Sequence, residues 1–221
     1  MCNRTCIMFG ARNLAAEEIQ GKRVLEIGSI DVNGNLRPTV EMLGPREYVG
    51  VDIEKGRGVD VVCSAEDVLD KFGKESFDAV ISTEMLEHIR DWRRVVSNIK
   101  NICRPGGVIL LTTRSYGFKY HGFPYDFWRY EIEDMKNIFS DFEIQALQED
   151  PEMPGVLIKA KKPLHFAEND LSAYQLYSIV TNRKLKELHD GDFNNFYFKR
   201  LQFRLKLRAF RKKLKTMFSF S

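Results

Sequence analysis

The stretch Arg23-Val-Leu-Glu-Ile-Gly-Ser29 decides how the rest of this sequence is interpreted. It has the pattern of a short apolar strand over residues 23–27 that ends at Gly28, with the acid Glu26 inside the apolar run. A carboxylate in such a place needs a partner. A strand that runs into a glycine turn is the way in which α/β proteins present backbone N–H groups to a nucleotide. The stretch therefore predicts a ligand site at the carboxyl end of the first strand.

Further apolar runs alternate with helical patterns along the chain. We expect strands over residues 48–52, 59–63, 77–82 and 108–113, and helices over residues 7–20, 37–44 and 84–103. Strands that are apolar on both faces and alternate with helices are typical of a parallel sheet that is covered on both sides. The sequence therefore predicts an α/β fold with helices on both faces of the sheet.

The pattern changes in the next part of the chain. A loop rich in aromatic residues covers 116–130, a helix is expected over 131–139, and two strands follow over 142–147 and 156–161. Only a short Pro/Gly connection joins these two strands, so they must be antiparallel, because a parallel crossover needs a dozen or more residues. We therefore predict a Rossmann-like, doubly wound sheet of seven strands, mostly parallel with an antiparallel final strand, in a domain of residues 1–162.

The remaining residues, 163–221, are predicted to form a helical extension with a basic tail. From Phe193 onward the chain holds nine Lys or Arg residues and no acid, which leaves 25 basic against 31 acidic residues in the rest of the chain. Apolar residues step along one face of the expected tail helix: Phe196, Phe203, Leu207, Phe210, Leu214 and Met217. Three roles stay open for the tail: docking on its own domain with a solvated basic face, peripheral contact with an anionic membrane surface, and binding of a partner protein or, less favoured, of nucleic acid.

The cysteines and the hydropathy of the sequence indicate the cellular compartment of the protein. The cysteines are Cys2, Cys6, Cys63 and Cys103, and no second pair stands at zinc-ligand spacing beside the first two. We therefore expect reduced thiols and no bound metal. The sequence begins without a charged-then-apolar signal pattern, and no run reaches the roughly 18 apolar residues of a membrane span. We predict a cytoplasmic protein, peripheral to the inner face of the membrane if its tail binds there.

Polar residues follow the predicted strands at the edge where Gly28 lies. Asp52 ends the second strand, where an acid accepts hydrogen bonds from two ribose hydroxyls; capping of a helix is the other interpretation. The segment Ser64-Ala-Glu66 follows the third strand and can flank an adenine ring, although Ser64 with Asp67 is also a capping arrangement. Thr83-Glu84 follows the fourth strand and faces the same crevice. Together these positions favour an adenosine-bearing cofactor.

Residues 22–162 resemble the class I S-adenosylmethionine-dependent methyltransferases, specifically the type 11 group. The motifs that carry the resemblance occur in the family's order: VLEIGS, YVGVDI, SAEDV, FDAVISTEMLEHI and ICRPGGVILLTT. The resemblance implies S-adenosylmethionine as cofactor, with these residues around it: Glu26, Gly28, Ser29, Asp52, Ile53, Ser64, Ala65, Glu66, Thr83 and Glu84. Two departures stand out. Gly28 is followed by Ser29-Ile-Asp31 instead of further glycines, and Ser64 stands where the family often has an acid.

A methyltransferase of this kind needs few catalytic groups, because the sulfonium is already a good leaving group. A hydroxyl acceptor would need a base, for which histidine is suited near neutral pH. The candidates are His88, expected one turn into a helix, and His121 in the aromatic loop. Candidate acceptor contacts in that loop are Tyr116, Tyr125, Asp126 and Arg129. The other interpretation of the loop is a packed apolar plug in which Asp126 pairs with Arg129.

The aromatic loop also resembles loops of methyltransferases encoded with polysaccharide and glycan enzymes, which suggests a sugar hydroxyl or another small acceptor. The sequence also bears on two other functions. A nicotinamide-dependent oxidoreductase is disfavoured by the missing G-x-G-x-x-G pattern and by the antiparallel final pair. A binding or scaffold protein that keeps the fold without turnover, targeted by its tail, stays open because of the altered glycine loop.

Overall fold

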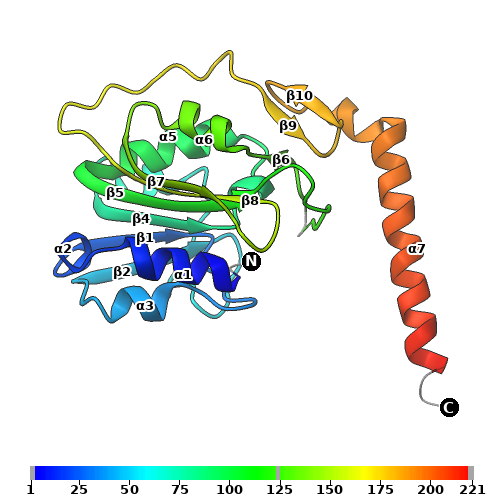
Figure 1. Cartoon of the computed structure of the whole chain (residues 1–221), viewed down its shortest axis with the longest axis horizontal. Coiled ribbons are helices and arrows are strands. Elements are labelled where there is room, and N and C mark those ends of the chain that lie inside the picture. Colours follow the sequence, from blue (N-terminus) through cyan, green and yellow to red (C-terminus); the bar gives the residue numbers. More distant parts are fainter. Residues whose placement is uncertain (1–2, 123–124, 219–221) are drawn as a thin grey trace.

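A seven-stranded mixed sheet forms the centre of the chain (Figure 1). The computed structural model describes residues 3–122 and 125–218, with side chains up to Arg211. The strands are β1 (Arg23–Ile27), β2 (Glu47–Asp52), β3 (Val61–Val62), β4 (Phe77–Thr83), β5 (Cys103–Arg114), β7 (Glu143–Glu149) and β8 (Gly155–Lys161). Their order is β3-β2-β1-β4-β5-β8-β7, and β8 is antiparallel to both of its neighbours while β1 to β5 pair in parallel. The predicted fold, including the antiparallel final strand, is confirmed.

The centre of the sheet is apolar on both faces, as the uninterrupted apolar runs indicated. Leu25 of β1 lies opposite Val49 of β2 on one side and Val80 of β4 on the other. Leu25 and Val80 are fully buried. Because helices cover both faces, such strands need not alternate between apolar and polar residues.

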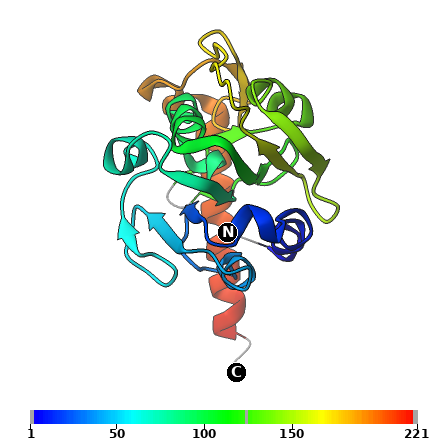
Figure 2. The same ribbon diagram turned by 90° about the vertical axis from the view of Figure 1, so that its left-hand side faces the viewer.

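Two helical layers cover the sheet (Figures 1 and 2). One layer consists of α1 (Arg4–Asn13), α2 (Ala16–Ile19) and α3 (Arg37–Glu41), and the other of α4 (Val68–Phe72), α5 (Trp92–Ile102) and α6 (Ile132–Ile138). Phe9 and Val40 of the first layer pack in one apolar cluster with Val24 of β1. Ile99 of α5 packs in the other cluster with Leu25 of the same strand. Neighbouring residues of β1 thus bury their side chains on opposite faces.

The helix predicted over residues 84–103 is wrong in its first half. Glu84 has a positive φ of 56°, which ends β4 in a sharp turn, and Leu86–His88 then form a short 3-10 turn, η1. The helix α5 begins only at Trp92, where the Asp91 side chain accepts a hydrogen bond from the Arg94 N–H. Such a cap fixes a helix start. His88 therefore lies in a turn beside the end of β4, and not on a helix face.

The helix predicted over residues 7–20 is also interrupted. It divides into α1 and α2 because Leu14 and Ala15 are extended. The Glu18 carboxylate accepts a hydrogen bond from the Ala15 N–H and so starts α2 anew. The helix α3 and the strand β3 are shorter than the predicted ranges 37–44 and 59–63.

The extension after residue 162 was predicted to be helical, but it also contains two short strands. The strands β9 (Leu176–Ser178) and β10 (Arg183–Leu185) form a three-stranded sheet with β6 (Trp128–Arg129), a strand inside the aromatic loop. A second 3-10 turn, η2 (Asp190–Asn194), leads to the last helix. The extension is thereby bound to the aromatic loop, and the division of the chain at residue 162 stays a prediction.

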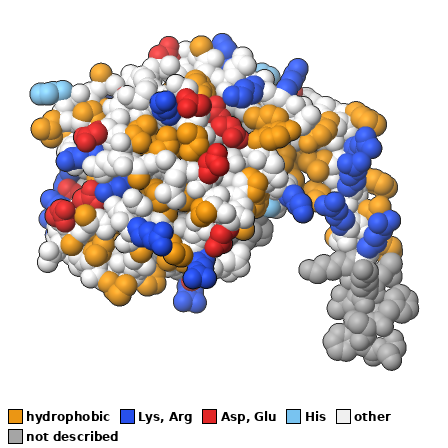
Figure 3. Space-filling view, viewed as in Figure 1, with side chains coloured by type: hydrophobic (Ala, Val, Ile, Leu, Met, Phe, Trp, Pro, Cys, Tyr) orange, Lys and Arg blue, Asp and Glu red, His pale blue; other side chains and the backbone are white. Residues whose placement is uncertain are grey.

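The predicted tail helix is present as α7 (Phe196–Phe218), which projects away from the sheet (Figure 1). Among the described side chains of this helix, those at its beginning pack on the body, where Phe198 is buried. Phe203, Leu207 and Phe210 are exposed, and Lys and Arg side chains lie along the same part of the helix (Figure 3). The helix is thus not docked on its own domain along its whole length. The side chains of Leu214 and Met217 lie outside the described residues, as does Cys2.

Candidate active site

A pocket lies at the carboxyl ends of β1, β2 and β4, the edge at which the sequence placed a ligand. Residues predicted to surround a cofactor line it together: Glu26, Gly28, Ser29, Asp52, Ile53, Ala65, Thr83 and Glu84. Ser64 and Glu66 lie outside this lining; the Ser64 hydroxyl instead accepts a hydrogen bond from the Glu66 N–H. Both candidate histidines, His88 and His121, line the pocket as well.

The turn at Gly28 brings backbone to the pocket wall. Gly28 has a φ of 80°, and a Cβ there would lie 2.8 Å from the Cβ of Met85. Only glycine fits this conformation and this contact. The N–H groups of Gly28 and Ser29 both donate to the Val51 carbonyl oxygen, at 2.9 and 3.0 Å, so the turn is fastened to β2.

A glycine in a neighbouring segment lies close to the backbone of the first loop. Gly58 has a φ of 87°, and a Cβ there would lie 2.5 Å from the Ser29 carbonyl oxygen. The loop is held against this segment because the Asp31 N–H donates to the Arg57 carbonyl oxygen and the Gly34 N–H to the Asp31 carboxylate. The first loop and this segment therefore pack backbone against backbone, and the lack of a side chain at Gly58 makes this approach possible.

Asp52 joins this loop to the end of β2. Its Oδ2 accepts a hydrogen bond from the Ile30 N–H at 3.1 Å, and its Oδ1 accepts from the Glu54 N–H at 3.3 Å. No helix begins there, so the capping interpretation is wrong. Each carboxylate oxygen has a second lone pair, which leaves Asp52 able to accept from a ligand in the pocket.

Glu26 is buried at the base of the pocket. Its Oε2 accepts a hydrogen bond from the Tyr48 hydroxyl at 2.8 Å, whereas Oε1 receives none from the residues that the structure describes. Burial raises the pKa of Glu26 from 4.5 to about 7, against the lowering effect of the Tyr48 hydrogen bond. An acid in this state gains from a cation placed at Oε1.

Glu84 and Thr83 form the wall at the end of β4. Oε1 of Glu84 accepts from the Thr112 hydroxyl at 3.0 Å, and Oε2 pairs with Arg114, which also contacts Asp150 at 3.2 Å. All of these side chains are buried. The Glu84 carboxylate is thus held by the protein itself, and it gives this wall a fixed shape.

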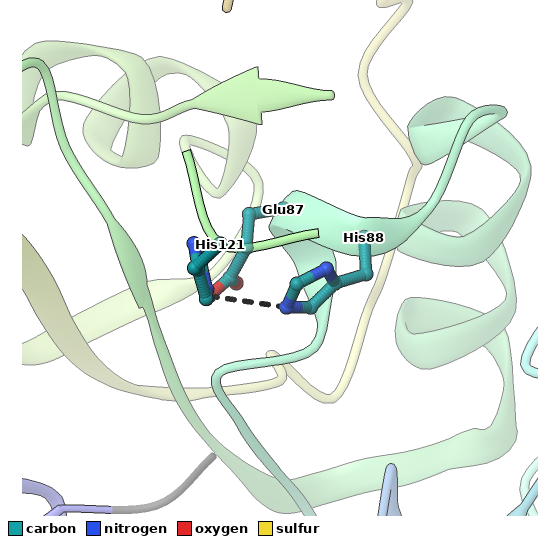
Figure 4. A group of neighbouring side chains, drawn as sticks. All are labelled: Glu87, His88 and His121. Atoms are coloured by element: carbon teal, nitrogen blue, oxygen red, sulfur yellow. Dashed lines mark ion pairs between the residues drawn. The ribbon is translucent and has the colours of Figure 1, made fainter. Parts of the chain in front are cut away.

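The other end of the pocket holds Glu87, His88 and His121, named here the His–Glu cluster (Figure 4). Nε2 of His121 lies 3.5 Å and Nε2 of His88 lies 4.0 Å from Oε1 of Glu87. The two imidazole rings meet edge to face with their centroids 4.7 Å apart. Glu87 is fully buried, and its Oε2 accepts a hydrogen bond from Thr113 of β5 at 2.9 Å.

Each histidine of the cluster is oriented through its Nδ1. Nδ1 of His88 lies 2.5 Å from the carbonyl oxygen of Tyr125, and Nδ1 of His121 lies 2.9 Å from the Asp126 carboxylate. Both oxygens are acceptors, so both Nδ1 atoms carry hydrogen. Both Nε2 atoms consequently face the pocket side of the cluster.

The charges within the cluster reinforce one another. Burial by itself would raise the pKa of Glu87, but its interactions with His121 and His88 lower it to about 2. Burial would lower the pKa of His121, but the Asp126 and Glu87 carboxylates raise it to about 9. Hydrogen bonds from Arg129 and His121 hold the pKa of Asp126 far below its usual range, although burial opposes this.

The predicted acceptor contacts fall into two groups. Asp126 and Arg129 are buried and joined by two hydrogen bonds, at 2.5 and 2.7 Å, so the geometry supports the interpretation in which they pair. Tyr116 and Tyr125 are exposed.

A second hollow meets the pocket at Glu84 and His121, and its remaining lining is Asn3, Asn33, Arg114, Phe118 and Met153.

Comparison with known proteins identifies the family to which the chain belongs. A family model described as a methyltransferase domain matches residues 3–188. The chain belongs to this methyltransferase family. The predicted enzyme class and its cofactor, S-adenosylmethionine, are thereby confirmed.

The relatives of this methyltransferase cover only part of its length. It is 31% identical over 133 residues to a ubiquinone biosynthesis O-methyltransferase of Parvibaculum lavamentivorans, which is 54% of this chain and 51% of the relative. It is 30% identical to a phthiotriol/phenolphthiotriol dimycocerosates methyltransferase of Mycobacterium ulcerans, over 50% of this chain and 44% of that protein. The chain thus spans about half the length of the curated relatives it matches.

Solved structures share the fold at low sequence identity. The 1,6-didemethyltoxoflavin-N1-methyltransferase of Burkholderia thailandensis, 14% identical, has a TM-score of 0.57 over 72% of this chain and 78% of that one. The [4+2]-cyclase SpnF, also 14% identical, has a TM-score of 0.57 over 73% of this chain and 81% of that one. A methyltransferase and a cyclase therefore match this methyltransferase equally well, so the fold alone leaves the acceptor open.

Sequence reasoning missed Glu87 among the site residues of this methyltransferase. The acid stands directly before His88, so an acid–histidine pair was visible in the sequence. The helix predicted over these residues led us to miss the pair, because adjacent residues on a helix point in different directions. In the observed 3-10 turn, Glu87 and His88 approach each other, and His121 arrives from the aromatic loop.

Glu26→Gln should remove a pH dependence from the stability of this methyltransferase. A folded pKa of about 7 against an ordinary value of 4.5 means that stability present below about pH 4.5 is lost as the pH rises through 7. The loss amounts to about 3 kcal/mol in the free energy of unfolding. Urea denaturation between about pH 5 and about pH 8 measures it as the difference between wild type and variant.

The control for this measurement is Glu152→Gln, at an exposed position. Its stability should follow that of the wild type across the pH range. Parallel pH profiles for the wild type and Glu26→Gln would contradict the raised pKa of Glu26.

Proposed function

We propose that this methyltransferase transfers the methyl group of S-adenosylmethionine to a hydroxyl of a small-molecule or glycan acceptor that lies beside the His–Glu cluster. The observation that carries the proposal is the continuity of one pocket. It runs from Glu26 and Asp52 at one end to His88 and His121 at the other. The first end suits a cofactor with ribose hydroxyls and an ammonium group, and the second suits an acceptor that must lose a proton.

At the cofactor end, each group has a chemically matched residue. The ribose hydroxyls donate to Asp52, as an acid at the end of a second strand allows. Ala65 and Ile53 line the side on which the adenine lies. The methionine ammonium lies near Oε1 of Glu26, the buried oxygen that receives no hydrogen bond from the described residues. Ser64 and Glu66 then contribute only by shaping the backbone around Ala65.

At the acceptor end, the reaction joins the hydroxyl oxygen to the methyl carbon. The carbon–sulfur bond breaks with its electron pair left on sulfur, which gives S-adenosylhomocysteine, and the hydroxyl proton is released. The cofactor supplies the leaving group, so the protein positions the acceptor and assists proton removal. His88 and His121 both line the pocket. His88 is the one placed to accept the proton, whereas His121, with a pKa raised to about 9 by Asp126 and Glu87, is a cation near neutral pH and positions the acceptor.

The names of the relatives favour a hydroxyl acceptor. The ubiquinone biosynthesis relative described above is an O-methyltransferase by name, and this supports oxygen as the acceptor atom. The second hollow, which meets the pocket at Glu84 and His121, provides room for the acceptor. Its polar Arg114 and Asn33 are consistent with an acceptor that carries several oxygen atoms.

Asp52→Ala should weaken the binding of S-adenosylhomocysteine by one to two orders of magnitude, or roughly 1.5–3 kcal/mol, because two charge-assisted hydrogen bonds are lost. Isothermal titration calorimetry measures this on the purified chain. Asp70→Ala, at an exposed position on α4, is the matched control and should bind as the wild type does. Equal affinity in wild type and Asp52→Ala would remove the ribose assignment.

His88→Gln should lower methyl transfer to hydroxyl acceptors by roughly 100-fold or more, since positioned proton transfer contributes that much. The measurement is transfer of labelled methyl from S-adenosylmethionine to a panel of dihydroxybenzoates, hydroxylated lipids and sugars, with amines as a comparison panel. His165→Gln, at an exposed position, should retain wild-type activity. Transfer to amines alone, or full activity in His88→Gln, would overturn the hydroxyl proposal.

The exposed apolar face of α7 favours a second activity, peripheral binding to an anionic membrane. Phe203, Leu207 and Phe210 repeat at helical spacing, are exposed, and lie among Arg204 and Arg208. Bulky apolar residues between basic ones are the pattern of helices that lie in a membrane interface. No helix among the described residues is long and apolar enough to cross a membrane.

Replacement of Phe203, Leu207 and Phe210 together by Ser should abolish sedimentation of the chain with vesicles that contain phosphatidylserine. The loss should be nearly complete, because burial of large apolar side chains supplies roughly 1.5–3 kcal/mol each. Vesicles of neutral lipid should retain less of the wild type, since the charge attraction is absent. The same pelleting for wild type and the triple variant would exclude this face as a membrane contact.

A further inference from the structure

One carboxylate oxygen of the His–Glu cluster is buried without a hydrogen bond. Glu87 is fully buried, and Thr113 donates to its Oε2, whereas Oε1 receives no hydrogen bond from the described residues. Oε1 faces Nε2 of His121 at 3.5 Å and Nε2 of His88 at 4.0 Å. Near neutral pH the protonated His121 offsets part of the cost of this buried charge, and a metal ion among these three atoms would take over that role by displacing the Nε2 proton of His121.

Both imidazole rings are held in the way that metal-binding histidines are held. Nδ1 of His88 donates to the Tyr125 carbonyl oxygen, and Nδ1 of His121 donates to the Asp126 carboxylate. A histidine that binds a metal nearly always donates its other ring N–H to a carboxylate or a backbone carbonyl. The protein thus presents Nε2 of both rings toward one point, beside an anionic oxygen (Figure 4).

We propose that Glu87 Oε1, His88 Nε2 and His121 Nε2 bind a divalent transition-metal ion of the zinc type at the acceptor end of the pocket. One ligand atom from each residue lies within 4.8 Å of the other two. Ligands of a tetrahedral zinc ion lie about 3.3 Å apart, so a small rotation of the two rings about their Nδ1 hydrogen bonds closes the site. The expectation of no metal, drawn from cysteine spacing, did not extend to ligands that are distant in sequence.

The ligand set selects the kind of metal. Two imidazole nitrogens with one carboxylate suit zinc, iron or cobalt, whereas magnesium prefers an all-oxygen environment. Three protein ligands leave a position open, as in catalytic zinc sites. His88 and His121 line the pocket, so the open position faces the acceptor.

The role of the ion rests on the proposed function. An acceptor hydroxyl bound to the ion has a lowered pKa, as water does on zinc. Because Nε2 of His88 is then a ligand, the ion replaces the imidazole as the group that activates the hydroxyl. The hydroxyl proton passes to solvent, the oxygen bonds to the methyl carbon, and the electron pair of the broken carbon–sulfur bond stays on sulfur. The metal site itself depends only on the three ligand atoms.

The test is a metal titration of the full chain after treatment with a chelator. Co²⁺ is added while the visible absorption is recorded, and Zn²⁺ affinity is measured by competition with a chromophoric chelator. The wild type should bind one equivalent of each, Mg²⁺ should not compete, and Zn²⁺ should raise the melting temperature. Glu87→Gln and His88→Gln should each weaken binding by roughly 100-fold or more, beyond the loss seen when only a supporting partner is changed. His165→Gln, at an exposed position, should bind as the wild type does.

Calorimetry with S-adenosylhomocysteine on every variant shows whether the pocket has kept its fold. His88 is the decisive position if the fully buried Glu87 does not tolerate replacement. No binding of Co²⁺ or Zn²⁺ by a wild-type chain that binds S-adenosylhomocysteine would overturn the proposal, as would equal affinity in His88→Gln. A thiolate charge-transfer band with Co²⁺ would overturn it too, by assigning the metal to a cysteine. A chain that binds zinc but methylates no hydroxyl in the panel would retain the metal site and remove the proposed function.

Discussion

The carboxylate of Glu87 joins the parts of the active site that the sheet alone does not bring together. Its side chain accepts from Thr113 of β5 and faces the two imidazole rings, and its backbone carbonyl oxygen accepts from the Phe127 N–H at 2.8 Å. A single residue thus fastens the turn after β4 to the neighbouring strand and to the aromatic loop. Because the carboxylate is fully buried, these contacts are made in a medium of low dielectric constant, where each is stronger and each loss is more costly.

The aromatic loop in turn depends on the buried ion pair between Asp126 and Arg129 and on contacts with the extension. Arg129 holds the two oxygens of Asp126, and Asp126 orients His121. The loop is also paired to β9 through Trp128 and Ser178, and the Ile179 N–H donates to the Phe127 carbonyl oxygen. His121 therefore owes its place in the pocket to residues that follow the seven-stranded sheet in the chain.

The sequence was sufficient for the sheet because the sheet follows from local patterns. Runs such as Val24–Ile27, apart from Glu26, and Val108–Leu111 are apolar on both faces, and the short link after Asp150 requires an antiparallel pair. The cofactor end of the pocket followed as well, since the carboxyl ends of parallel strands meet at one edge. The interpretation of Gly28 with Asp52 as neighbours needed nothing more than strand order.

The acceptor end could not be derived in this way. The turn over Leu86–His88 departs from a helix because of a positive φ at Glu84 and a cap at Asp91, and neither is an apolar pattern. The strand β6 has two residues, and its partner β9 lies almost 50 positions later, so nothing local signals the pairing. The contact between His121 and Glu87 depends on both features.

The two ends of the pocket thus have different origins in the chain, and this difference bears on what each can recognise. The cofactor end is built from strand ends and one tight turn, which every sheet of this order provides. The acceptor end is built from the 3-10 turn, the aromatic loop and the extension. Substitutions in the extension can therefore move His121 without touching Gly28 or Asp52. On the proposed function, packing between β6 and β9 therefore influences which acceptor binds beside His121, while cofactor binding depends on the sheet.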